Sequence, residues 1–143
     1  MAIRVRPLRL ADYEAMIELF RVCGLNPRTR GRDSRKAIAR QLRATRGLYL
    51  GAFDGDALVG TVLATHDVRK GWINRLAVRP AYRRQGIAAR LVRLCERRLR
   101  AMGIEMFAAL VEPGNEASEA VFRDLGYEVT RLTYARKKLR PEV

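Results

Sequence analysis

The feature of this sequence that could do chemistry is a run of hydrogen-bond donors at residues 83–89. It reads Arg83-Arg84-Gln85-Gly86-Ile87-Ala88-Ala89, and it lies between an apolar segment and a long amphipathic segment. The first amides of a helix have no partner within the helix, and the helix dipole adds partial positive charge there. Gly86 and Ala88 leave the backbone open to a ligand, and the two arginines add charged donors. The pattern therefore predicts an anion site suited to phosphate.

Two familiar phosphate-binding motifs do not occur in the chain. The P-loop requires G-x-x-x-x-G-K-[ST], which the sequence lacks. The dinucleotide fingerprint requires three glycines, but Ala88 and Leu91 stand at its later glycine positions. The pattern that remains is Arg-x-x-Gly-x-Ala, from Arg83 to Ala88, between a strand and a helix.

The elements that must position this run follow from the spacing of apolar residues. Alternating or short apolar stretches predict strands, and apolar residues three and four apart predict helices. We expect helices over residues 12–23, 34–45, 86–102 and 115–125, with Asp12 and Ser34 as N-caps. We expect strands over residues 3–6, 48–53, 58–65, 72–78, 107–111, 127–129 and 134–139. This order predicts a mixed α/β fold, with one sheet and helices on both faces.

Several motifs resemble those of the GNAT superfamily of N-acetyltransferases, and they occur along the chain in the family's order. Residues 83–88 resemble its acetyl-coenzyme-A signature, Q/R-x-x-G-x-G/A. Residues 4–12 resemble its opening strand and helix, residues 59–61 its third strand, and residues 115–127 its N-x-x-A…Y-x-x-x-G-F/Y ending. The resemblance implies a single N-acetyltransferase domain over residues 1–143. It also implies a mostly antiparallel sheet of about seven strands with helices on both faces.

The resemblance implies a site for acetyl-CoA as cosubstrate, without a metal. In the family, the pyrophosphate of coenzyme A lies on the amides of the turn, here residues 84–89. The pantetheine arm lies beside the signature strand, which splays from the next strand, and a backbone N–H near Leu76 would polarise the thioester carbonyl. The cofactor-binding residues so implied are Leu76, Ala77, Val78, Arg83, Arg84, Gln85, Gly86, Ile87, Ala88, Ala89, Asn115 and Phe122.

The sequence departs from the family pattern at the acid that protonates the leaving thiolate. The usual tyrosine is replaced by Phe122, which has no proton to give. The thiolate could leave unprotonated, because a thiol with a pKa of about 8.5 is a tolerable leaving group. Ser118 could instead relay a proton through water, or Tyr127 or Tyr134 could reach in from the last strands. Phe122 would still pack against the cofactor arm.

The base that deprotonates the acceptor amine is equally open. Many family members carry a glutamate on the signature strand, but residues 72–78 contain none. The candidates are Glu112, which follows the next strand, and His66 and Asp67, where the third strand ends. Each has a plainer interpretation, because Glu112 could cap the turn before Pro113, and His66 and Asp67 could form a solvated strand end.

The charge of the chain indicates the partners that it would attract. Lysine and arginine total 29 and aspartate and glutamate total 15, which gives a net charge of +14. Nucleic acid is not expected as a partner, because no aromatic residues are interleaved with the arginines of the long helix. Three arginines, Arg28, Arg30 and Arg32, lie in the loop where the family builds its acceptor wall. They suggest an acceptor with negative charge near its amine.

Cysteine and histidine are scarce. Cys23 and Cys95 fall in apolar stripes and are expected to be buried thiols, so we expect direct transfer in a ternary complex. His66 is the single histidine, so a zinc site is not expected. The chain lacks an apolar run of about 18–20 residues and a signal-peptide pattern, so we expect a cytoplasmic protein without a membrane partner. Family members often pair, which makes a homodimer a further expectation.

Together these features predict transfer of an acetyl group from acetyl-CoA to a primary amine. The amine could belong to a protein N-terminus, a lysine or a small molecule. The alternative is a non-catalytic acyl-CoA-binding regulatory module, because the usual tyrosine and strand glutamate are both missing. Acetyl transfer to a panel of amines would separate the two.

Overall fold

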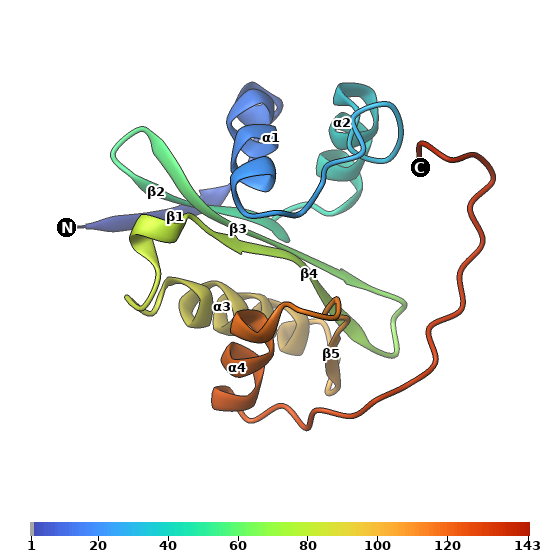
Figure 1. Cartoon of the computed structure of the whole chain (residues 1–143). Coiled ribbons are helices and arrows are strands. Elements are labelled where there is room, and N and C mark those ends of the chain that lie inside the picture. The colour runs from blue at the N-terminus through green and yellow to red at the C-terminus, as the bar shows by residue number, and fades with distance from the viewer. Residues whose placement is uncertain (1) are drawn as a thin grey trace.

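Five strands form one sheet in the computed structural model, which describes residues 2–143 (Figure 1). The strands are β1 (Ile3–Pro7), β2 (Tyr49–Asp54), β3 (Ala57–His66), β4 (Gly71–Val78) and β5 (Phe107–Ala109). The helices are α1 (Tyr13–Val22), α2 (Arg35–Ala44), α3 (Ile87–Ala101) and α4 (Glu116–Asp124), with short 3-10 turns η1 (Leu10–Asp12) and η2 (Pro80–Tyr82). The strands lie in chain order, and only the β4–β5 pair is parallel.

Helices cover both faces of the sheet. Helices α1 and α2 lie on one face, and α3 and α4 lie on the other (Figure 1). Met16 and Phe20 of α1 are buried on the first face, and Leu91 and Leu99 of α3 are buried on the second. The predicted mixed α/β class, with one sheet between helical layers, is confirmed.

Local sequence explains where these elements begin and end. The Ser34 hydroxyl accepts a 3.1 Å hydrogen bond from the Ala37 N–H and so caps α2, as predicted. Leu91, Cys95 and Leu99 recur four residues apart on α3, and all three are fully buried against the sheet. Between β2 and β3, Gly55 adopts a φ of 59°, which a tight hairpin turn requires.

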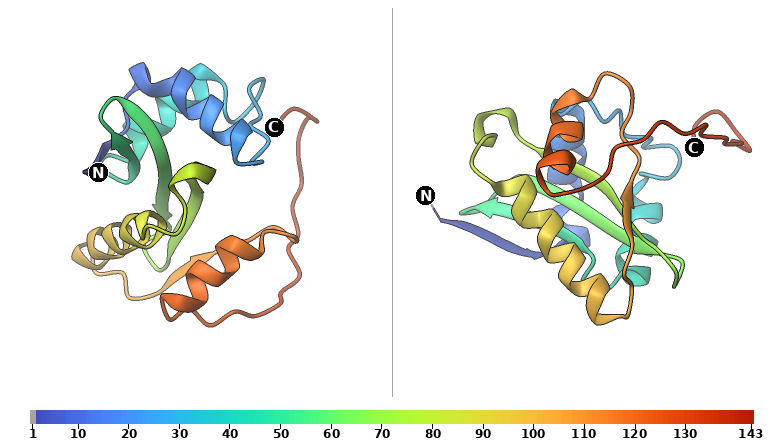
Figure 2. Two further views of the ribbon diagram at one scale, coloured as in Figure 1. Left: turned by 60° about the vertical axis from the view of Figure 1, so that its left-hand side comes forward. Right: turned by 90° about the horizontal axis from the view of Figure 1, so that it is seen from below.

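The expected number of strands is wrong. The segments 127–129 and 134–139 form no strand, and β5 ends at Ala109 rather than at Val111. The chain after α4 is extended and runs to the side of the molecule where α1 is joined to α2 (Figure 2). The physical reason lies at Tyr127, whose side chain is held against α3 by a hydrogen bond to Glu96. Tyr127 therefore takes its side-chain partner from α3, and residue 127 lies outside the sheet.

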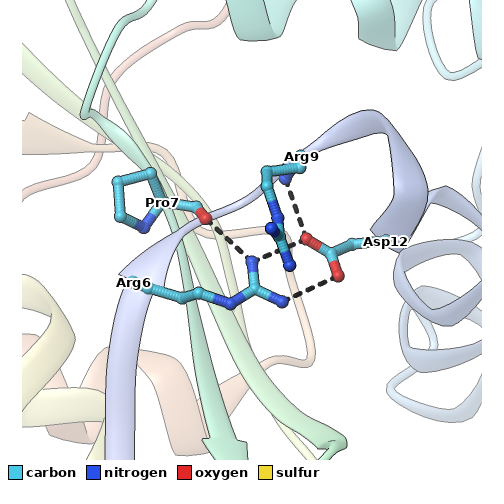
Figure 3. A network of polar contacts seen from close by, with 4 residues as sticks. All are labelled: Arg6, Pro7, Arg9 and Asp12. Atoms are coloured by element: carbon cyan, nitrogen blue, oxygen red, sulfur yellow. Dashed lines mark hydrogen bonds and ion pairs between the residues drawn. The ribbon is translucent and has the colours of Figure 1, made fainter.

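Asp12 does not cap α1 as expected. Its carboxylate makes no hydrogen bond to the helix. It instead accepts bonds of 2.8 and 3.0 Å from the Arg6 guanidinium and one of 2.8 Å from the Arg9 N–H (Figure 3). The hydrogen bond from Arg6 holds the pKa of Asp12 below its usual range. Asp12 therefore joins the end of β1 to the start of the helical layer.

Candidate functional site

The turn that precedes α3 presents unpaired backbone donors. Arg84 and Gly86, on either side of Gln85, have φ values of 63° and 79°, so both adopt the left-handed conformation of a tight turn. The first hydrogen bond into the helix runs from Arg90 N–H to the Gly86 carbonyl at 3.0 Å, which leaves the N–H groups of residues 87–89 without helical partners. A Cβ at Gly86 would meet nothing within 4 Å, so the backbone there is open to a ligand.

Arg83 and Arg84 differ in how they are held. The Arg83 Nε donates a 2.9 Å hydrogen bond to the carbonyl of Val78, the last residue of β4. This bond closes the turn back onto the strand that precedes it. Arg84 and Gln85 are exposed at the tip of the turn. The residues that the sequence predicts to bind phosphate, 83–89, thus lie together in one turn that is fixed to the end of β4.

The strands β4 and β5 separate beside this turn. Their parallel pairing covers only Gly71–Ile73 of β4 against Phe107–Ala109 of β5. Beyond Ile73, β4 pairs with β3 alone, through Asn74, Ala77 and Val78. The expected separation of these two strands therefore begins at Ile73 and Ala109, and it leaves one edge of residues 76–78 without a strand partner.

A bulge interrupts β4 at this separation. Leu63 of β3 aligns with Asn74 and Thr61 aligns with Ala77, so Arg75 and Leu76 have no partner in the β3 register. Arg75 adopts a φ of 52°, a left-handed conformation that costs a non-glycine residue about 1–3 kcal/mol. The fully buried Thr61 hydroxyl donates a 2.9 Å hydrogen bond to the Arg75 carbonyl. The bulge therefore has a defined geometry next to Leu76.

Asp33 anchors the Arg75 side chain. The guanidinium donates a 2.7 Å hydrogen bond to a carboxylate whose side chain is 3% exposed. The same oxygen accepts a 2.8 Å bond from the Arg28 N–H, and the Tyr13 hydroxyl donates a 2.8 Å bond to the Asp33 carbonyl. Sequence reasoning missed this pair, because nothing in an arginine-rich loop signals which side chain folds inward.

Glu112 follows β5, three residues after Ala109, the last residue of that strand. Ile73 pairs with Ala109, and the chain from residue 110 onward has no partner on β4. Glu112 is exposed, and its backbone carbonyl accepts a 3.1 Å bond from the Asn115 N–H. Glu112 therefore lies on the exposed segment that continues the chain beyond the pairing of β5 with β4.

His66 and Asp67 lie far from Leu76. His66 pairs with Gly71 at the start of β4, and the stretch from Gly71 to Leu76 spans about 16 Å of strand. His66 Nδ1 accepts a 3.1 Å bond from the Val68 N–H. Asp67 accepts bonds of 3.0 and 2.7 Å from two turn amides, and its hydrogen bond from Lys70 lowers its pKa. Both residues stabilise the β3–β4 turn.

The C-terminal motif places its residues around α4. The Asn115 side chain accepts a 3.2 Å bond from the Ser118 N–H and caps α4. Phe122 is buried in the core, with its ring centroid 5.0 Å from that of Tyr127. The Tyr127 hydroxyl donates a 2.6 Å bond to Glu96 of α3, and burial together with this bond raises its pKa. Tyr127 is therefore poorly placed to supply a proton, whereas Tyr134 is exposed.

The two cysteines differ in how deeply they are buried. Cys95 is fully buried, and burial raises the pKa of its thiol to about 12. Cys23 is only partly buried, and its Sγ donates a 3.4 Å hydrogen bond to the Val78 carbonyl. No group of three or more histidine, cysteine or acidic residues gathers as metal ligands in these residues. None of their helices has the length and apolar character needed to cross a membrane.

Comparison with known proteins identifies relatives across nearly the whole length of the chain. Residues 13–127 match the model of the acetyltransferase (GNAT) family. An acetyltransferase of Pectobacterium atrosepticum is 31% identical over 136 residues, which is 94% of each chain. An acetyltransferase of Photorhabdus laumondii is 33% identical over 125 residues, 87% of this chain and 85% of that protein.

A solved structure shows the same fold. The PaiA N-acetyltransferase from Thermoplasma acidophilum, in complex with coenzyme A, superimposes with a TM-score of 0.84. The match is 21% identical in sequence and covers 93% of this chain and 94% of that one.

Proposed function

The chain belongs to the acetyltransferase (GNAT) family of acetyl-CoA-dependent N-acetyltransferases, and from this premise we propose that it acetylates a primary amine by direct attack in a ternary complex. The observation that carries the proposal is the separation of β4 from β5 at Ile73 and Ala109, with the donor-rich turn at its end. Residues 1–143 would form one catalytic domain. Direct transfer fits Cys95, because a buried thiol of raised pKa is a poor nucleophile.

The backbone of the turn would hold the pyrophosphate of acetyl-CoA. The N–H groups of residues 84–89 supply donors, and the α3 dipole adds positive charge at the same place. The unpartnered edge of residues 76–78 would hydrogen-bond the pantetheine arm. The N–H of Leu76, beside the bulge, would donate to the thioester carbonyl and stabilise the negative charge that develops there.

Glu112 is our candidate for the general base. Of the bases predicted from the sequence, it is the one on the segment that directly follows the separation of β5 from β4. The amine must lose a proton before or during attack, and an exposed carboxylate there could take it directly or through water. The leaving thiolate could depart unprotonated, or it could receive a proton from Ser118 through water or from Tyr134.

The loop between α1 and α2 would favour an acidic acceptor. Arg30 and Arg32 are exposed on it. The C-terminal segment comes close to this loop, because a Cβ at Gly31 would meet the backbone of Glu142 and Val143. Desolvation and then the charges of Arg28, Arg136 and Arg32 lower the pKa of Lys138, so cations from two distant segments gather there. A protein N-terminus, a lysine or a small amine with a neighbouring carboxylate would suit this surface.

Replacing Gly86 tests the proposed cosubstrate site. Gly86→Glu adds a side chain and a negative charge where the pyrophosphate would bind. We expect the dissociation constant for acetyl-CoA, measured by titration calorimetry, to rise about 100-fold or more. This change corresponds to the loss of two charge-assisted hydrogen bonds.

Gly103→Glu provides a matched control at the other end of α3. Gly103 has a φ of 83°, close to the 79° of Gly86, and a Cβ at either position would meet nothing within 4 Å. The two variants therefore carry the same strain and the same charge. Equal acetyl-CoA affinity in both would refute the assignment of the turn.

A further inference from the structure

We infer that Asp33 is a positioning residue, which acts through Arg75 to hold the β4 bulge in the shape that aims the Leu76 N–H. Asp33 lies on the loop that joins α1 to α2, and Arg75 lies on β4, so the ion pair links two segments that are 42 residues apart. The inference rests on the proposed function, because that function gives the Leu76 N–H its task.

The backbone at Arg75 is held from two sides. On one side, the Thr61 hydroxyl donates to the Arg75 carbonyl at 2.9 Å. On the other side, Asp33 binds the guanidinium at 2.7 Å. A bulge residue with a φ of 52° would ordinarily be glycine, so an arginine there needs outside support to keep that conformation. Both supports act on the residue directly before Leu76.

Asp33 is itself fixed by its own loop. Its carboxylate oxygen accepts a 2.8 Å hydrogen bond from the Arg28 N–H, and its own N–H donates a 3.0 Å hydrogen bond to the Arg28 carbonyl. The Tyr13 hydroxyl of α1 donates to the Asp33 carbonyl. The Arg75 guanidinium also lies 5.2 Å from the ring centre of Phe20, also in α1. The loop and α1 therefore both contact this ion pair, the loop through Asp33 and α1 through Tyr13 and Phe20.

Stability alone is a poor explanation for this pair. Its side chains are 17% and 3% exposed, and desolvating two charges to this extent offsets much of their attraction. The buried hydroxyl of Tyr49 has no hydrogen-bond partner within residues 2–143. The charges of Arg75 and Asp33 both act on it electrostatically. A strained backbone, a buried ion pair and an unpaired hydroxyl in one place are typical of functional sites, where geometry takes precedence over stability.

A second ion pair offers a matched comparison. Arg79 follows β4 and binds Glu18 of α1 through hydrogen bonds of 3.0 and 2.8 Å. This pair also joins β4 to α1, but Arg79 lies beyond the bulge, and Glu18 is about half exposed. Loss of the Glu18 charge should therefore leave the peptide at Leu76 undisturbed.

The test uses the full-length protein and [1-13C]acetyl-CoA. The NMR shift of the bound carbonyl carbon reports the hydrogen bond that the thioester accepts, without need of an acceptor. Asp33→Asn removes the charge and keeps the size of the side chain, and Thr61→Val removes the hydroxyl. We expect both variants to move the carbonyl resonance toward that of free acetyl-CoA. We also expect kcat to fall about tenfold or more, with the dissociation constant for acetyl-CoA within about twofold.

Each outcome decides the inference. Glu18→Gln should keep the wild-type shift and kcat. Wild-type shift and kcat in Asp33→Asn would overturn the inference and leave the proposed function standing. If Asp33→Asn loses activity only because it unfolds, Thr61→Val decides. A folded Thr61→Val variant with the wild-type shift and kcat would likewise overturn the inference and leave the proposed function standing. A wild-type protein that neither binds nor uses acetyl-CoA would refute the proposed function itself.

Discussion

At the residue scale, the decisive chemical question is where the proton of the acceptor amine goes. Of the carboxylates and imidazole that the sequence offered, Glu112 is the one on the segment that directly follows β5, where the pairing with β4 has ended. His66 and Asp67 are bound to turn amides at the far end of β4. Phe122 is part of the core and carries no proton.

Glu112→Gln tests this proposal directly. The amide keeps the size of the side chain but cannot accept the proton, so we expect kcat to fall about 100-fold. Acetyl-CoA affinity should not change. Glu105→Gln is the control, because Glu105 is exposed at the opposite end of β5. Steady-state kinetics with an active amine measure both, and an unchanged kcat in Glu112→Gln would remove Glu112 from the mechanism.

At the element scale, the site exists because two strands pair for three residues and then part. Parallel pairing of β4 with β5 stops where the β4 bulge begins, so neither neighbouring strand takes up the peptide after Arg75. The same strand ends at the turn that opens α3. One continuous segment, residues 74–89, therefore provides a strand edge, a bulge and a helix N-terminus in succession.

An ion pair at a junction between elements also makes the stability of the fold depend on pH. The Arg6–Asp12 pair fastens β1 to the helices that follow it (Figure 3). Because the folded state lowers the pKa of Asp12, this pair stabilises the protein above the unfolded pKa of about 3.9. Its contribution is lost as the pH falls through the lower, folded-state pKa.

Asp12→Asn should therefore reduce the free energy of unfolding by about 2 kcal/mol at pH 7. The difference from wild type should shrink as the pH falls below about 4. Urea denaturation at a series of pH values measures it. Glu14→Gln is the control, because Glu14 forms a 3.4 Å pair with Arg35 at the exposed surface. A constant difference across the whole range would contradict the assigned pair.

At the scale of the whole molecule, the arginines that contribute to the net charge of +14 form groups with different roles. The arginines of α3 that face solvent lie opposite its apolar stripe. Those of the loop between α1 and α2 lie close to cations of the C-terminal segment. Only the second group belongs to the loop that we propose favours an acidic acceptor.

The double variant Arg30→Glu, Arg32→Glu should change acceptor preference. We compare a peptide that begins Ala-Glu with one that begins Ala-Gln, and we expect the ratio of their kcat/KM values to fall about tenfold, since each exposed charge contributes up to about 1 kcal/mol. The effect should weaken with added salt. Arg93→Glu, Arg97→Glu on α3 has the same charge change and should keep the ratio. Equal ratios in both variants would count against an acidic acceptor.

The sequence by itself determined the features that depend on neighbouring residues. Apolar spacing located the four helices, and the composition of residues 83–89 marked the turn at the start of α3. These are local properties, because caps, turns and helix dipoles act over a few residues. The family resemblance added the separation of β4 from β5.

Only the tertiary structure decided which distant groups meet. It placed Asp33 on Arg75, drew Tyr127 to Glu96 and moved Asp12 from its helix to Arg6. It also left residues 127–139 outside the sheet. The physical reason is that a charged or polar side chain takes the partner that burial brings within hydrogen-bond distance. That choice is made among groups tens of residues apart, so no local pattern records it.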